Sequence, residues 1–286
     1  MIKIDGFCDL CVESDGITKD SLRVTCERLF NLGYRTVAIN QTIDDTVFES
    51  KRKKKKGEAR DNPDVVPIPL AFEFADEFKK RLQILHRLTI SYSDQSNIHK
   101  LNQSLNFKKY HIIAVLPNSQ SAFQHACGGA FDFDIITFNP LHKSPIKMNR
   151  KLYDVLKDRN VYFELMYSPA IRDSTSRKNI IHMSHLYHAY GKSKNIIISS
   201  SAAEAFQVRS PYDVINLGLI LGLSEEQCKT AILSNCRKLI IRAEGRRHGK
   251  AVMIVKQLTQ EAFIDSDESD DDMEQLLEPA LKKTKL

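Results

Sequence analysis

Basic and hydroxyl-bearing residues gather after two apolar runs in the second half of the 286-residue chain. They are Arg172, Asp173, Arg177 and Lys178 after the run at 162–167, and Ser199, Ser200, Ser201, Arg209 and Asp213 at and beyond the end of the run at 195–200. Guanidinium groups and hydroxyls beside helix starts are suited to holding phosphates. An alternative is that they tie loops together through Arg–Asp pairs and helix caps, and both interpretations stay open.

A second basic feature is the run of six lysines and arginines at 51–56, with Lys53 and Lys54 near its centre. It lies in a long connection, residues 42–84, that also contains several prolines. A basic cluster on a loop indicates a nuclear-import signal or a contact with nucleic acid. A merely solvated loop is the alternative.

The sequence offers little support for a metal or nucleotide site. Cys8 and Cys11 form a C-x-x-C, but no second cysteine pair or nearby histidine completes a zinc set. His182, His185 and His188 are three residues apart on one expected helix, which rotates the third well away from the first. Phosphate-binding glycine loops and a G-x-S-x-G elbow are also missing. We therefore expect this chain to bind no cofactor.

The net charge of +6 is unevenly distributed along the chain. Residues 261–286 hold nine acidic and three basic residues, which leaves residues 1–260 with a net charge of +12. A body this basic predicts a polyanionic partner, with RNA, DNA and an anionic membrane all open. The acidic stretch at 257–286 has the composition of a disordered tail. Scattered cysteines and the lack of a long apolar run favour a soluble intracellular protein.

The elements expected to position these residues alternate regularly along the chain. Strands are predicted at 7–12, 36–40, 85–92, 112–116, 134–138, 162–167 and 195–200, and helices at 21–32, 148–158, 175–190 and from Ser224 towards Arg242. Such alternation is typical of a parallel sheet, and about 250 residues suits a closed barrel. We expect one α/β, TIM-barrel-like domain of about seven strands over residues 1–250, with the basic loop at 42–84 inserted. The phosphate-binding candidates then share the carboxyl-terminal mouth.

Two segments give the sequence a resemblance to a known family. Residues 167–171, Tyr-Ser-Pro-Ala-Ile, and 209–213, Arg-Ser-Pro-Tyr-Asp, are similar to those of the thirty-kilodalton protein subunit of eukaryotic ribonuclease P and ribonuclease MRP. The resemblance continues through 195–201 and Leu223-Ser224-Glu225, and it covers roughly residues 5–245. It implies a barrel related to the polymerase and histidinol phosphatase superfamily.

The resemblance also implies a function and a set of partners. The expected role is that of a non-catalytic, RNA-binding subunit that stabilises the catalytic RNA. Ribonuclease P removes the 5′ leader of precursor tRNA, and ribonuclease MRP processes precursor rRNA. The implied partners are both RNAs, the other protein subunits and, indirectly, precursor tRNA, with no membrane. Catalytic magnesium is expected on the RNA, and the implied location is the nucleus and nucleolus.

Site residues follow from the same resemblance. Those expected to face RNA are Arg87, Arg172, Arg177, Lys178 and Arg209, together with Lys53 and Lys54 of the loop. Those expected to shape the barrel mouth are Asp9, Asp173, Ser199, Ser200, Ser201 and Asp213. Metal-dependent relatives carry His-x-His on the first strand, whereas this chain has Phe7-Cys8-Asp9-Leu10-Cys11 there.

Two other functions remain open from the sequence. A metal-dependent phosphoesterase of the polymerase and histidinol phosphatase type would use the same mouth, with Asp9, Glu164 and Asp173 as possible ligands. A protein–protein scaffold would use the basic surface for import and solubility only.

Overall fold

The computed structural model describes residues 6–44, 64–72, 74–78, 81–94, 98–129 and 131–249. The expectations for Lys53, Lys54 and the acidic tail at 257–286 concern residues outside these ranges.

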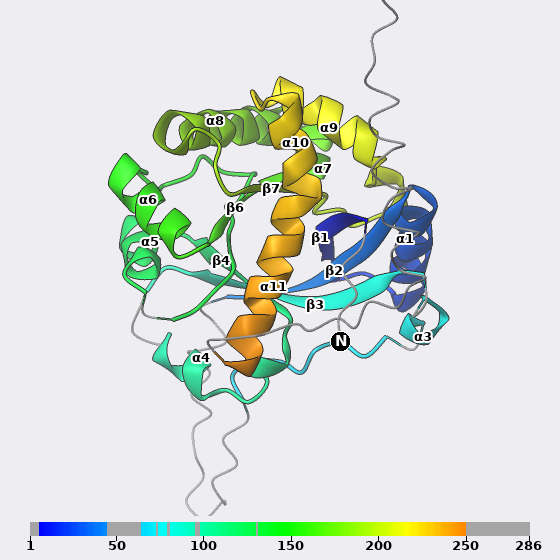
Figure 1. Ribbon diagram of the computed structural model, residues 1–286. Coiled ribbons are helices and arrows are strands. Elements are labelled where there is room, and N and C mark those ends of the chain that lie inside the picture. Colours follow the sequence, from blue (N-terminus) through cyan, green and yellow to red (C-terminus); the bar gives the residue numbers. More distant parts are fainter. Residues whose placement is uncertain are drawn as a thin grey trace, which may run out of the picture. The chain divides into compact units, whose positions relative to one another are not determined.

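Seven parallel strands form one sheet in chain order (Figure 1). They are β1 (Phe7–Glu13), β2 (Tyr34–Ile43), β3 (Gln83–Tyr92), β4 (Ile112–Pro117), β5 (Ile135–Ile136), β6 (Tyr162–Met166) and β7 (Ile196–Ser199). The chain after β7 returns to β1, where Val12 and Ala202 form a parallel bridge. The Ser201 amide donates to the Cys11 carbonyl at 2.8 Å, and the Glu13 amide donates to the Ala202 carbonyl at 3.0 Å. The sheet is thus a nearly closed barrel, which confirms the predicted α/β barrel fold.

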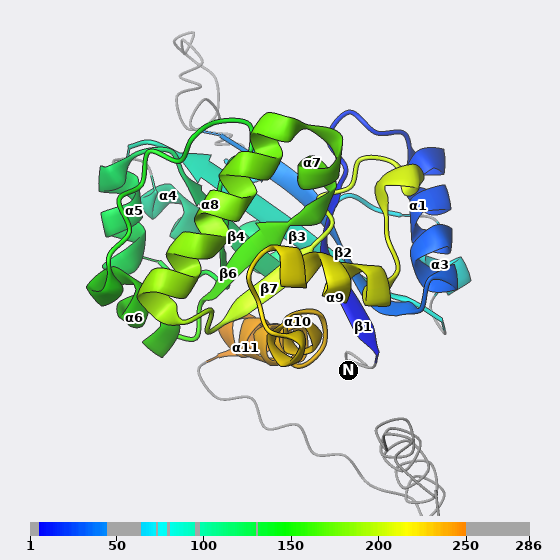
Figure 2. The same ribbon diagram turned by 90° about the horizontal axis from the view of Figure 1, so that it is seen from above.

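The helices lie around the outside of the barrel, and the last one, α11, lies across one end of it (Figure 2). They are α1 (Lys19–Asn31), α3 (Ala75–Phe78), α4 (His99–Gln103), α5 (Gln120–Cys127), α6 (Arg150–Asp158), α7 (Tyr167–Arg172), α8 (Ser174–Gly191), α9 (Pro211–Ile220), α10 (Glu225–Ile232) and α11 (Ser234–His248). Alternate strand residues face them, as Val37 and Ile39 of β2 pack in one cluster with Leu22 and Leu29 of α1. Burial of these apolar faces fixes which side chains point into the barrel.

Helix α11 covers the amino-terminal end of the barrel, and Figure 1 shows it crossing in front of the strands. Its Cys236, Leu239 and Ile240 pack in one buried cluster with interior residues from the starts of the strands. These strand residues form the apolar layer: Cys8, Ala38, Leu85, Ile112, Ile135, Tyr162 and Ile197. The plugged end leaves the opposite, carboxyl-terminal mouth as the end that can take a ligand.

The prediction of a single long helix from Ser224 towards Arg242 is wrong. Ser224 does begin a helix with a capping box to Gln227, but α10 ends at Ile232. Leu233 leaves the helical conformation, with φ −124° and ψ −84°, and α11 starts again at Ser234. The break lets the chain turn from the outer layer onto the end of the barrel.

Asp134 fixes α11 to the barrel. Its buried carboxylate lies 2.6 Å from the Arg242 guanidinium and 3.0 Å from that of Arg246, and it accepts the Ile113 amide at 2.9 Å. The strand expected at 134–138 is reduced to the two residues of β5, Ile135–Ile136. A buried carboxylate with two arginine partners and a backbone donor is fully compensated.

Candidate nucleic-acid interface at the barrel mouth

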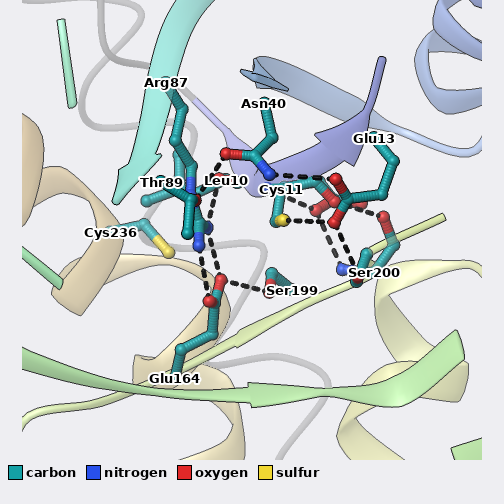
Figure 3. Close-up of polar contacts among 12 residues, drawn as sticks. Leu10, Cys11, Glu13, Asn40, Arg87, Thr89, Glu164, Ser199, Ser200 and Cys236 are labelled. Atoms are coloured by element: carbon teal, nitrogen blue, oxygen red, sulfur yellow. Dashed lines mark hydrogen bonds and ion pairs between the residues drawn. The ribbon is translucent and has the colours of Figure 1, made fainter. Parts of the chain in front are cut away.

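A layer of polar side chains lies inside the barrel between the apolar layer and the mouth (Figure 3). This polar layer consists of Asn40, Arg87, Thr89, Glu164 and Ser199. Four of the five follow an apolar-layer residue at strand spacing, as Arg87 follows Leu85 on β3 and Glu164 follows Tyr162 on β6, and Thr89 in turn follows Arg87. The change from apolar to polar along these strands therefore gives the mouth its chemistry.

Arg87 and Glu164 form a bidentate ion pair at the centre of this layer. Arg87 Nη1 lies 2.5 Å from Glu164 Oε1, Nη2 lies 2.6 Å from Oε2, and neither side chain is more than 1% exposed. Nη1 also donates to the Leu10 carbonyl, and Ser199 Oγ donates to Glu164. Burial acts to raise the pKa of Glu164, but the charge and hydrogen bonds of Arg87 outweigh it and lower that pKa.

This geometry corrects the expectation for Arg87. The sequence analysis placed it on an RNA-facing rim, and that is wrong because its guanidinium points into the barrel and is buried. Its partner Glu164 was considered only as a metal ligand. The signal that was missed is the register of β3, where Leu85, Arg87 and Thr89 share the inward face.

Asp9 is also buried, and it joins the first strand to the end of the last. Its Oδ1 accepts the Ser200 amide at 3.0 Å and the Cys11 amide at 3.2 Å. Oδ2 has no hydrogen-bond partner among the residues that the structure describes. Burial raises the pKa of Asp9 to about 6, against the opposing effect of the hydrogen bonds. The side chain therefore fixes the seam of the barrel.

The three consecutive serines serve that seam as well. Ser199 donates to Glu164, Ser200 Oγ donates to the Cys11 carbonyl at 2.9 Å, and Ser201 Oγ donates to Glu13 at 2.8 Å. Each hydroxyl thus donates a hydrogen bond to a residue of a barrel strand. The structure brings these serines together with Asp9, as expected for the mouth.

The basic residues around the mouth divide into two kinds. Arg177 donates to the Ala170 carbonyl at 2.7 Å and to the Ile171 carbonyl at 3.2 Å, and so closes the end of α7. Arg209 donates to the Phe206 and Val208 carbonyls, with its guanidinium 5.7 Å from the Phe206 ring. For these two arginines, the loop-tying interpretation holds.

Arg172 and Lys178 differ, because both are exposed and neither forms a hydrogen bond or ion pair with another described residue. Arg172 ends α7 and Lys178 lies in the first turns of α8. Free cations on a rim are the groups that phosphate contacts require. These two residues are the best-placed of the predicted RNA contacts.

The two predicted aspartates of the mouth act locally at helix starts. Asp173 caps α8 by accepting the Ser176 amide at 2.7 Å, and hydrogen bonds from Ser176 lower its pKa. Asp213 accepts from Oγ of Ser210, the residue that caps α9, at 2.8 Å. Both carboxylates are exposed and do not join the polar layer.

The three carboxylates named as possible metal ligands are therefore separated. Glu164 is paired with Arg87, Asp9 bonds to backbone amides, and Asp173 caps a helix. Within the described part of the chain, no group of three or more histidine, cysteine, aspartate or glutamate residues is placed to hold a metal ion. The helices described there include none that is long and apolar enough to span a membrane.

The chain is, by its fold and mouth, a parallel α/β barrel with a helical plug at one end and a buried ion pair near the other. A family described as RNase P subunit p30 matches residues 6–248. The chain belongs to this family. The match spans nearly the whole described barrel, which agrees with the resemblance seen at 167–171 and 209–213.

Relatives agree with this assignment, and a solved structure shares the fold. Ribonuclease P protein subunit p30 of Mus musculus is 34% identical over 243 residues, covering 85% of this chain and 87% of the mouse protein. Ribonuclease P/MRP protein subunit RPP1 of Saccharomyces cerevisiae is 24% identical and covers 74% of this chain and 69% of the yeast protein. A chain of the cryo-EM structure of archaeal ribonuclease P with mature tRNA shares the fold, with a TM-score of 0.60 at 15% identity, and the match covers 88% of this chain and 100% of that one.

Proposed function

We propose that this chain is a non-catalytic, RNA-binding subunit of ribonuclease P that stabilises the catalytic RNA during removal of the 5′ leader from precursor tRNA. The observation that carries the proposal is the family match over residues 6–248. The exposed cations Arg172 and Lys178 on the rim supply a surface for RNA phosphates. The Arg87–Glu164 pair at the centre of the mouth supports this surface structurally. Because Glu164 is paired with Arg87, it does not act as a reactive carboxylate in this proposal.

The proposal extends to ribonuclease MRP and precursor rRNA, and the name of the yeast relative supports this extension. We place the protein in the nucleus and nucleolus, with both RNAs and the other protein subunits as partners and precursor tRNA as an indirect one. The basic run at 51–56 supports nuclear import or a further RNA contact. Magnesium ions belong, in this proposal, to the RNA.

The test is purification of the full chain from its own cells under native conditions, followed by sequencing of the RNA that accompanies it. The proposal expects strong enrichment of the ribonuclease P RNA and, for its second part, of the ribonuclease MRP RNA. Enrichment of neither RNA contradicts the proposal. Enrichment of the first alone removes only the MRP role.

A further inference from the structure

A small pocket lies where β4 and β5 end, beside the barrel mouth. Its volume is about 280 Å³. Leu116 and Phe138 contribute its apolar part, and Asn118, His142, Lys143 and Ser144 contribute its polar part. Pockets for drug-sized ligands span roughly 300–1,000 Å³, so this one suits a single flat ring system.

The loop that forms one side of the pocket is fixed in place. The Lys147 amide donates to Gln120 Oε1 at 2.7 Å, and the Gln120 side-chain amide donates back to the Lys147 carbonyl at 3.3 Å. Asn179 of α8 donates to the Pro140 carbonyl at 2.9 Å. These bonds anchor the loop to two helices. The pocket therefore needs no rearrangement to receive a ligand, which lowers the cost of binding.

A lysine lies at the edge of this pocket. Lys143 and His142 are exposed on its edge, and neither forms a hydrogen bond or ion pair with any other residue in the described ranges. An apolar cavity beside an exposed lysine matches a nucleotide, whose base is flat and largely apolar on its faces and whose phosphate is anionic.

We propose that this pocket receives one unpaired nucleobase of the RNA, while Lys143 on its edge contacts an adjacent phosphate. The inference rests on the proposed function, because it names the part of the RNA that one region of the mouth recognises. Proteins read single-stranded RNA by taking unstacked bases into such sites. Asn118 and Ser144 line the pocket and are the polar side chains that the edge of the base would meet.

The experiment uses the full chain and the ribonuclease P RNA of the same organism. Base reactivity to dimethyl sulfate and 2′-hydroxyl acylation are mapped along the RNA with and without protein. The pocket variant is His142→Ala with Lys143→Ala. The control is Lys108→Ala, an exposed lysine that precedes β4 at the opposite end of the strands.

We expect the wild-type protein and the control to protect one unpaired base that the pocket variant leaves reactive. An RNA that is abasic at that nucleotide should bind the wild-type protein about 5- to 160-fold more weakly, the range expected for losing one stacked base. Combining the abasic RNA with the pocket variant should cost less than the sum of the two separate losses, because both changes remove the base contact and only the phosphate contact of Lys143 is lost in addition.

The opposing outcomes separate the two proposals. If the wild-type protein protects the RNA but no base responds to the pocket variant, the pocket assignment is overturned and the proposed function stands. The pocket assignment is also overturned, and the proposed function again stands, if a protein side chain of another subunit is found to occupy the pocket when the other subunits are added. If the wild-type protein gives no protection anywhere on the RNA, both proposals fail.

Discussion

At the scale of single residues, the mouth is organised by buried charges more than by exposed ones. The sequence identified Asp9 and Ser199 as mouth residues through its family resemblance. It misplaced Arg87, since an arginine in a strand can face either side and only the register shows which. Its pairing with Glu164, 77 residues away, depends on the closed barrel.

The ion pair gives the first prediction. Arg87→Met leaves the Glu164 carboxylate buried without its partner and should lower the free energy of unfolding by about 3–5 kcal/mol. The double variant Arg87→Met/Glu164→Leu removes both charges and should recover most of that loss. Urea unfolding measures the free energy of unfolding of both variants, with the exposed Arg172→Met as control. A double variant no more stable than Arg87→Met would contradict the account.

Asp9 gives a prediction about pH. Its pKa is about 6 in the folded protein against 3.8 as the ordinary value, so between about pH 4 and 6 the folded state binds a proton that the unfolded state has lost. The stability that this proton provides falls as the pH rises through this window. Asp9→Asn is neutral throughout. Its free energy of unfolding relative to wild type should rise by about 2.4 kcal/mol from pH 4 to pH 7.5.

Urea unfolding of both proteins at a series of pH values checks this difference, which isolates Asp9 from other groups that titrate in the same range. A constant difference between variant and wild type across the series would show that the Asp9 carboxyl titrates normally.

At the scale of elements, the alternation of strands and helices was predictable because buried parallel strands are continuous apolar runs. The start of α10 was also predictable, from Ser224 and Gln227. The break at Leu233 was not, because apolar residues recur at helical spacing on both sides of it. The turn is set by tertiary contacts, namely the apolar layer and the clamp of Arg242 and Arg246 on Asp134.

The plugging role of α11 gives a matched pair of variants on one helix. Leu239 is fully buried against the apolar layer, whereas Ile241 is 45% exposed two positions later. Leu239→Ala should lower the free energy of unfolding by about 2–5 kcal/mol, the usual cost of such a cavity. Ile241→Ala should cost well under half as much. Thermal or urea unfolding compares them, and equal effects would show that α11 does not seal the barrel.

At the scale of the whole molecule, one end of the barrel is closed by α11 and the other presents a rim with free cations. The net charge pointed only to a polyanion, and the family match indicates which RNA to test. Sequence could not distinguish the cations that bind loops, Arg177 and Arg209, from the free ones, Arg172 and Lys178. All four have the same chemistry, and only the folded loops show which are already engaged.

The salt dependence of binding to the ribonuclease P RNA tests the central claim most directly. Filter binding of the full chain should weaken steeply as salt rises, and Arg172→Gln/Lys178→Gln should reduce the slope of log affinity against log salt by about 1.4–1.8 for two lost phosphate contacts. The control Lys108→Gln/Lys238→Gln, two exposed lysines outside the mouth, should leave the slope unchanged. A flat salt response of the wild-type protein, or equal slopes for the mouth variant and the wild type, would contradict an RNA-binding mouth.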